Sequence, residues 1–246
     1  MGVGRHLRLA FVGKGGAGKS ALAGTLCRQL ARNGQPVLAL DLDTMAGLAL
    51  SLGLGEDGAR LPPGLAERVE GKGWEVKRGV RPSRLVDRYA KSGPDGVSFL
   101  ELGKLPDHVE PAVTVTFRYV LERFRRPGWS IVADLAAGTR QPMFGWARFA
   151  SVIAVVVDPS VKSTLTARRL VRAGIGTHLL ANKVQSDSDL AVIEAAVPLP
   201  LLGVVPYDAG VAEAEQGGAA PIDAAPDGPA VRAVGDVARY LLDMAA

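Results

Sequence analysis

The chain has 246 residues, of which 48% are hydrophobic and 22% are charged, and its formal net charge is +4. This length suits a single α/β domain, here residues 1–246, and it is enough to bury a substantial core. The single Cys27 excludes an intramolecular disulfide, and the basic start is followed by too short an apolar run for a secretory signal or a membrane span, so we expect a cytoplasmic protein.

Apolar runs rich in Val, Ile, Leu and Ala recur along the chain and predict strands that are covered on both faces. They lie at residues 7–12, 36–42, 97–102, 130–135, 152–157, 177–181 and 201–205. Segments with helical spacing lie between several of them, including a helix expected over 113–126 and another at the C-terminal end. This alternation predicts a doubly wound α/β fold with a mostly parallel sheet and helices on both faces.

Residues 54–96 differ from the rest because they are rich in Gly, Pro, Arg and Lys and show no clear period. We interpret them as a variable insertion beside the sheet rather than as a second domain.

The first predicted strand runs into the sequence GKGGAGKS, which satisfies the phosphate-binding pattern G-x-x-x-x-G-K-[ST] between a strand and a helix. The glycines let successive N–H groups point at phosphate oxygens, while Lys19 neutralises phosphate charge and the Ser20 hydroxyl coordinates Mg²⁺. The residues expected to contact a nucleotide here are Gly13, Lys14, Gly15, Gly16, Ala17, Gly18, Lys19, Ser20 and Ala21.

An ordinary phosphate loop does not require Lys14. At this position the chain has not yet turned back into the nucleotide pocket, so the side chain cannot easily reach the phosphates of its own nucleotide. With Lys14, the loop resembles the deviant Walker A loop of the MinD/ParA-type ATPases, which are P-loop NTPases of the SIMIBI class. The resemblance implies that Lys14 crosses a dimer interface to contact phosphate on the partner's nucleotide. An exposed lysine without a role is the alternative.

Asp41 and Asp43 end the second predicted strand, at the sheet edge where α/β proteins hold their ligands. The stretch is similar to the family's switch I. By that resemblance Asp43 orients the attacking water and belongs to the metal site, with Asp41 in the outer shell of the metal. Thr44 and Gly47 depart from the residues that many relatives have, and capping of the next helix is the alternative role for the two acids.

Asp134 ends the strand at 130–135, and Gly138 follows four residues later. This is the form of a Walker B strand leading into switch II. An acid at that strand end holds Mg²⁺ through water, and the Gly138 N–H is available to a γ-phosphate.

Asn182 ends a further strand, where the resemblance implies a hydrogen bond to adenine. The segment after the last strand resembles the family's base-binding segment, which places Pro206, Tyr207 and Asp208 beside the base. Asn182 as a turn residue and Asp208 as a helix N-cap are the alternatives.

Among the relatives, the sequence motifs most resemble those of the nickel-insertion ATPases of carbon monoxide dehydrogenase maturation. The cysteine pair that these use for metal is missing, and His108 alone makes a poor metal site, so we do not expect metal delivery. The C-terminal segment has few basic residues, which disfavours membrane binding. Clusters of Arg and Lys at 77–88 and 123–126 leave nonspecific DNA as a possible partner, with solvated helix faces as the simpler interpretation.

These motifs occur in the family's order and predict an ATP hydrolase that uses ATP and Mg²⁺, forms an ATP-dependent homodimer, and acts as a switch on an unidentified protein partner. Two alternatives stay open. One is a nucleotide-binding scaffold with little hydrolysis, and the other is a DNA-positioning ATPase.

Overall fold

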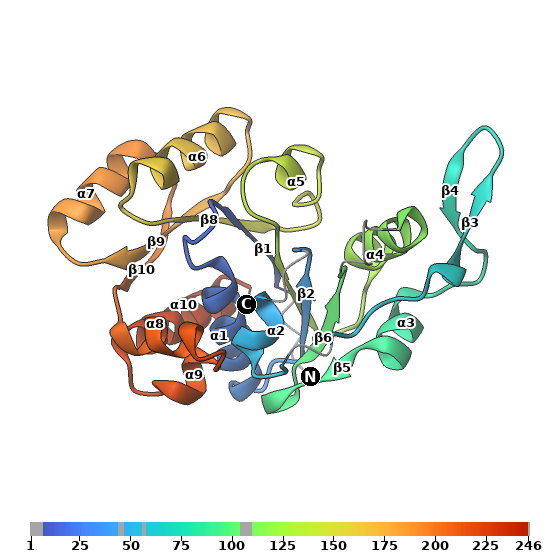
Figure 1. Cartoon of the computed structure of the whole chain (residues 1–246), viewed down its shortest axis with the longest axis horizontal. Coiled ribbons are helices and arrows are strands. Elements are labelled where there is room, and N and C mark those ends of the chain that lie inside the picture. The colour runs from blue at the N-terminus through green and yellow to red at the C-terminus, as the bar shows by residue number, and fades with distance from the viewer. Residues whose placement is uncertain (1–6, 44–46, 56–57, 104–109, 246) are drawn as a thin grey trace.

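The computed structural model describes residues 7–43, 47–55, 58–103 and 110–245. Within these residues, eight strands form one sheet in the order β10-β9-β8-β1-β7-β2-β6-β5 (Figure 1). The paired strands run parallel, except that β5 is antiparallel to β6. The strands of the sheet are β1 (Arg8–Gly13), β2 (Val37–Asp41), β5 (Lys91–Ser92), β6 (Ser98–Glu101), β7 (Ser130–Asp134), β8 (Val152–Val157), β9 (His178–Val184) and β10 (Leu201–Pro206).

Helices cover both faces of the sheet. Figure 1 shows α1 and α10 on one face and α6 and α7 on the other. The helices are α1 (Lys19–Arg32), α2 (Gly47–Leu52), α3 (Pro82–Tyr89), α4 (Pro111–Arg123), α5 (Arg140–Met143), α6 (Val161–Arg172), α7 (Asp187–Ala196), α8 (Ala209–Gln216), α9 (Pro221–Ala224) and α10 (Pro229–Met244), with short 3-10 turns η1 (Pro63–Leu65) and η2 (Pro94–Gly96). No helix in the described ranges is long and apolar enough to cross a membrane.

The central strands are buried because helices lie on both sides of them. Every residue of β2 and β7 is buried, which explains why these strands appear in the sequence as continuous apolar runs. The largest fully buried side chains include Phe11, Phe99 and Phe117. Cys27 is also fully buried, and burial raises the pKa of its thiol. The doubly wound α/β fold predicted from the sequence is therefore confirmed.

The segment at 54–96 contains regular elements that the sequence did not indicate. It includes α3, β5 and a hairpin of β3 (Ala66–Val69) and β4 (Gly73–Val76), which projects from the body of the molecule (Figure 1). Most hairpin residues are exposed, so their sequence carries no apolar alternation that would predict strands.

The parallel strands all point their carboxyl ends to one edge of the sheet. The loops that follow β1, β2, β7, β9 and β10 therefore meet there, although they are far apart in the sequence. These loops carry the residues of the candidate site.

Candidate nucleotide-binding site

The loop between β1 and α1 depends on glycines at two close approaches. Gly13 has φ of 152°, and a Cβ there would lie 2.5 Å from the Val156 carbonyl oxygen. Gly18 has φ of 91°, and its Cβ would lie 2.3 Å from Nδ2 of Asn182. A side chain at either position would clash with its neighbour and strain the backbone. Glycine at both positions therefore permits the tight curl that exposes N–H groups to an anion.

The two lysines of the loop lie in different surroundings. The Lys19 residue is 7% exposed, and its Nζ donates to the Lys14 carbonyl oxygen at 3.4 Å, inside the curl of the loop. Lys14 is only half-buried, and its Nζ lies 3.9 Å from the point where a Cβ of Gly16 would be. Gly15 and Gly16 are exposed, so Lys14 lies on the outer rim of the loop.

Asp134 lies directly beneath the start of α1. Its Oδ2 accepts a hydrogen bond of 2.5 Å from Ser20 Oγ, whereas its Oδ1 is buried without a partner among the described residues. Burial raises the pKa of Asp134 to about 6, although nearby Lys19 opposes this effect. An unsatisfied buried carboxylate oxygen beside a serine hydroxyl suits a hydrated Mg²⁺ ion.

Asp41 organises the backbone of the predicted switch I. Its Oδ1 accepts from the Asp43 N–H at 2.9 Å, and its Oδ2 accepts from the Leu48 N–H at 3.2 Å in the first turn of α2. Burial raises the pKa of Asp41 well above its usual range, and Asp134 adds to this. Asp41 therefore caps the first turn of α2, and its place in the outer shell of a metal stays a prediction.

The segment after Asp41 also approaches the loop closely. A Cβ at Gly47 would lie 2.9 Å from Ser20 Oγ, so α2 begins directly against the predicted metal-binding hydroxyl. Thr44 lies outside the described residues.

The loop after β7 is tied to both neighbouring segments. The Gly138 N–H donates to the Gly13 carbonyl oxygen at 2.9 Å in this structure, and its contact with a γ-phosphate stays a prediction. Gln141 accepts from the Ala136 N–H at 2.9 Å and donates through Nε2 to the Leu42 carbonyl oxygen at 2.8 Å. This bridge between the two predicted switches was missed because Gln141 belongs to no motif.

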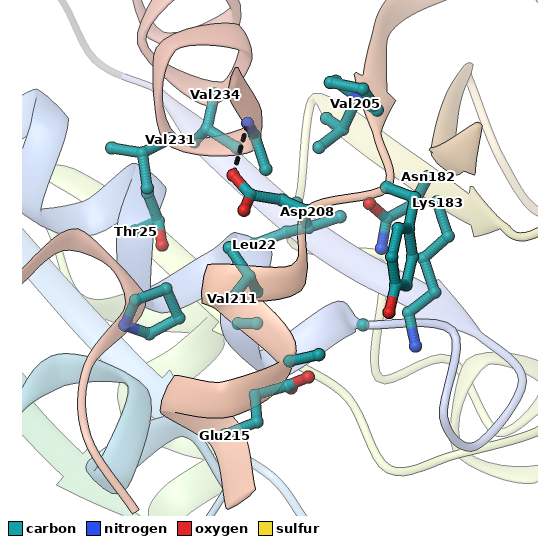
Figure 2. A pocket seen from close by; sticks show the side chains of 17 residues that line it. Leu22, Thr25, Asn182, Lys183, Val205, Asp208, Val211, Glu215, Val231 and Val234 are labelled. Carbon is teal, nitrogen blue, oxygen red and sulfur yellow. Dashed lines mark hydrogen bonds between the residues drawn. The ribbon is translucent and has the colours of Figure 1, made fainter. Parts of the chain in front are cut away.

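A pocket lies beside the loop, between α1, α8, α10 and the ends of β9 and β10 (Figure 2). Its walls are mostly apolar, which suits a flat base. The lining residues are Gly18, Ala21, Leu22, Thr25, Asn182, Lys183, Val205, Pro206, Tyr207, Asp208, Val211, Ala212, Glu215, Pro221, Ala230, Val231 and Val234.

Asn182 and Lys183 connect this pocket to the phosphate loop. The buried Asn182 donates through Nδ2 to the Ala17 carbonyl oxygen at 2.7 Å. Lys183 has φ of 59°, and its Nζ donates to the Gly16 carbonyl oxygen at 2.9 Å. Lys183 was not predicted from the sequence. Its position next to Asn182 at the end of a strand was the feature that could have indicated it. Asn182 lies within β9, so the alternative that it is a turn residue is wrong.

Asp208 holds two helices in place at the pocket wall. It caps α8 through the Gly210 N–H at 3.0 Å, and it accepts from the Ala230 N–H at the start of α10 at 3.1 Å (Figure 2). The N-cap role is therefore what the structure shows for its carboxylate.

No group of three or more His, Cys, Asp or Glu residues that could hold a metal is found in the described ranges. His108 lies outside the described residues.

Comparison with known proteins identifies the family. The model of the CobQ/CobB/MinD/ParA nucleotide-binding domain, CbiA, matches residues 9–222. The chain belongs to this family. The resemblance to MinD/ParA-type proteins predicted from the loop is thus confirmed.

Relatives of this CbiA-family chain match it along most of its length. The carbon monoxide dehydrogenase accessory protein CooC of Rhodospirillum rubrum is 26% identical, over 89% of this chain and 91% of the relative. An uncharacterized ATP-binding protein of Methanocaldococcus jannaschii is 29% identical, over 85% and 88% of the two chains.

Solved structures share the fold. The septum site-determining protein MinD of Pyrococcus horikoshii, complexed with Mg-ADP, has a TM-score of 0.70 and 20% identity, with 98% of this chain and 99% of that chain covered. A ParA family ATPase from Chlorobium tepidum has a TM-score of 0.71 and 18% identity, with 96% and 98% covered.

Proposed function

We propose that this protein is a Mg²⁺-dependent ATPase that pairs with a second copy of itself when ATP is bound, and that hydrolysis switches its grip on a partner protein. The observation that carries the proposal is the contrast between the two lysines of the loop. Lys19 is buried inside the curl, where it can serve its own nucleotide, while Lys14 lies on the exposed rim.

The residues at the metal end fit Mg²⁺. Asp134 has one buried oxygen without a partner and a second on Ser20, and the two groups together offer the oxygen ligands that Mg²⁺ prefers. Bound there, Mg²⁺ neutralises phosphate charge and orients the phosphate oxygens. We assign Ser20 to direct contact, Asp134 to contact through water, and Asp43 to the solvent side of the same site.

The chain's own groups then carry out phosphoryl transfer to water. Lys19 leaves the Lys14 carbonyl oxygen to bind the β- and γ-phosphates, and Asp43 orients the attacking water. The Gly138 N–H contacts the γ-phosphate once its hydrogen bond to Gly13 has opened. Lys14 of the second copy stabilises the charge that moves toward the leaving oxygen.

The base occupies the apolar pocket of Figure 2. Asn182 is held by Ala17 through one N–H, which leaves its Oδ1 to accept from the exocyclic amine of adenine. Pro206 and Tyr207 line the base through backbone groups. Asp208 acts by fixing α8 and α10, which form the wall.

A switch that acts on a partner is supported by similar proteins. The solved structures with this fold include a MinC:MinD cell division protein complex from Aquifex aeolicus, with a TM-score of 0.69 and 20% identity.

Phosphate release from ATP with and without Mg²⁺ tests the enzymatic part. Wild type should release phosphate only with Mg²⁺, Lys19→Ala should lose nucleotide binding, and Asp43→Ala should bind ATP but lose at least about 90% of the turnover. Lys72→Ala, at the tip of the exposed hairpin, is the matched control and should behave as wild type. Equal turnover in wild type and Asp43→Ala would refute the assignment of Asp43.

A nucleotide-binding scaffold with little hydrolysis is the second candidate. It is favoured by the tight packing of Gly47 on Ser20 and by the Gly138 N–H, which is bonded to Gly13 rather than directed at a phosphate. In that case ATP binds to wild type but no phosphate release rises above background, even with candidate partners present.

A further inference from the structure

A cavity of about 320 Å³ lies at the amino ends of β1 and β7, beside the end of α4. Arg8 begins β1 and is paired in register with Ile131 of β7, and both residues line the cavity. The phosphate loop follows the carboxyl end of β1, so the cavity and the nucleotide site lie at opposite edges of the sheet. The lining residues are Arg8, Phe124, Arg125, Arg126, Pro127, Trp129 and Ile131.

The charge of this cavity is positive and largely uncompensated. Its charged lining residues are all arginines, and no carboxylate of the described ranges lines it. Arg126 forms an ion pair with Asp87, whereas Arg8 and Arg125 donate only to neutral carbonyl oxygens among the described residues. Burial and the neighbouring Arg125 lower the pKa of Arg8 to about 10, as expected for a guanidinium without a carboxylate beside it.

Two of these arginines are held in place and still have N–H groups available. Arg8 donates to three carbonyl oxygens at 2.7–3.1 Å, which belong to α4, to Phe124 directly after it and to Phe149. One N–H on each of its Nη atoms has no acceptor in the described part of the chain. Arg125 donates through Nη1 alone, to two carbonyl oxygens at 2.7 and 2.9 Å, so its Nε and Nη2 are likewise available to a ligand.

The rest of the lining is apolar and partly aromatic. The rings of Phe124 and Trp129 meet edge to face with their centroids 5.8 Å apart. The guanidinium carbon of Arg126 lies 4.8 Å from the ring centroid of Trp129, so charge and ring are neighbours in one wall. Pro127 and Ile131 complete the apolar side. A flat apolar group can lie against these residues while an anionic head meets the arginines.

We propose that this cavity binds a small phosphate monoester with a flat apolar body, such as a nucleoside monophosphate. A phosphate monoester carries about 1.5–2 negative charges at neutral pH, and arginine forks bind its oxygens in pairs. Small-molecule sites span about 300–1,000 Å³, so a cavity of about 320 Å³ suits a ligand no larger than a mononucleotide. A polynucleotide would lie across an exposed surface and leave the apolar side of the cavity unused. The site is additional to the proposed ATPase function and does not depend on it.

Quenching of Trp129 fluorescence by para-nitrophenyl phosphate tests this proposal. The chain has three tryptophans, so the variant Trp74→Phe/Trp146→Phe keeps Trp129 alone as the reporter. A nitrophenyl ring quenches an indole that it contacts, so the quenching, corrected for absorbed light, should saturate. The monoanion para-nitrobenzoate should bind at least about fivefold more weakly, and the neutral para-nitrobenzyl alcohol should give no saturation.

Arg125→Gln in the same background should weaken binding at least about tenfold, because it removes a charge and the available N–H groups from the wall. Arg123→Gln is the matched control. Arg123 is an equally exposed arginine two residues earlier that does not line the cavity, so this change should alter affinity less than about twofold. Circular dichroism checks that each variant is folded. Equal losses in the two variants, or quenching that never saturates in the reporter background, would overturn the proposal.

A second arm separates this cavity from the phosphate loop. Lys19→Ala, which removes the main phosphate-binding side chain of the loop, should leave the quenching of Trp129 unchanged. Loss of quenching in this variant would place the probe in the nucleotide site and contradict the proposal. Calorimetric titration of Lys19→Ala with all its tryptophans present, with and without Arg125→Gln, repeats the comparison without the reporter substitutions.

Displacement of the probe from the Lys19→Ala reporter variant identifies the source of the phosphate. AMP or phenyl phosphate should displace para-nitrophenyl phosphate at a concentration at least about tenfold lower than inorganic phosphate does, because both add a flat apolar group. The more effective of the two distinguishes a nucleotide from another aromatic phosphate ester. Displacement by inorganic phosphate at the same concentration as by these esters would overturn the proposal, since no apolar body would then be required.

Discussion

At the scale of single residues, the site is defined by how each polar group is satisfied. Side-chain hydrogen bonds of Asp41, Asn182 and Asp208 hold backbone segments together. One oxygen of the buried Asp134, in contrast, has no partner in the described part of the chain. Such an atom costs stability unless a ligand satisfies it. The unpaired oxygen of Asp134 therefore lowers the stability of the ligand-free chain.

This leads to a pH-dependent prediction for Asp134→Asn. The pKa of Asp134 is about 6 in the folded chain, against 3.8 for an ordinary Asp. Protonation of this carboxyl therefore stabilises folded wild type below about pH 4, and this stabilisation is lost as the pH rises through about 6. The variant carries no such charge. In the absence of nucleotide it should be more stable than wild type by about 2–3 kcal/mol at neutral pH and gain little near pH 4.

Urea unfolding at the two pH values measures this difference. A variant less stable than wild type at neutral pH, or one with the same gain at both values, would contradict the account. The variant should also lose the stabilisation that Mg²⁺ and ATP give to wild type.

At the scale of elements, Gln141 links the loops after β2 and β7. In Gln141→Glu the new carboxylate can still accept from Ala136, but it faces the Leu42 carbonyl oxygen with no N–H to donate. Leu42 directly precedes Asp43, so the bridge helps to position that carboxylate. We expect turnover to fall about tenfold with the KM for ATP changed less than about twofold.

Steady-state phosphate release measures this effect. Gln216→Glu, the same charge change on the exposed end of α8, is the control and should leave both constants unchanged. If turnover falls equally in both variants, the effect is one of charge and not of the bridge.

The sequence predicted every strand of the sheet except β5, and also the phosphate loop, because these depend on local signals, namely continuous apolar runs and glycine spacing. It did not predict the hairpin, since β3 and β4 are mostly exposed. Nor did it predict Lys183 or Gln141, whose partners Gly16 and Leu42 are far away in the sequence. The Gly138 prediction described a phosphate-bound state, and the structure shows its N–H on Gly13 instead.

At the scale of the whole molecule, an ion-pair network connects α1 with Asp95 of η2 and with Asp223 of α9. Arg28 on α1, whose side chain is 4% exposed, donates to Asp95 at 2.7 Å and to Asp223 on α9. Pro221 of the same short helix lines the base pocket. Burial alone would raise the pKa of Asp95, but the hydrogen bonds from Arg28 lower it.

Arg28→Met should therefore reduce the free energy of unfolding by about 2–4 kcal/mol at neutral pH, because it leaves Asp95 and Asp223 with only the more exposed Arg32 as a partner. The deficit should shrink as the pH falls below about 4, where Asp95 becomes protonated. Arg32→Gln, on the 40% exposed neighbour in the same network, should cost less than about 1 kcal/mol. Urea unfolding compares the two, and equal losses would contradict the central place of Arg28.

The central claim is that ATP joins two copies through Lys14. Light scattering of the Asp43→Ala variant, which should retain ATP, measures this most directly. Its mass should double on addition of Mg²⁺ and ATP and stay at the monomer value with ADP. In this variant, the further substitution Lys14→Ala should prevent the doubling of the mass while ATP still binds. The further substitution Lys72→Ala should leave the doubling unchanged. A mass that doubles with Lys14→Ala as it does without it would contradict the claim.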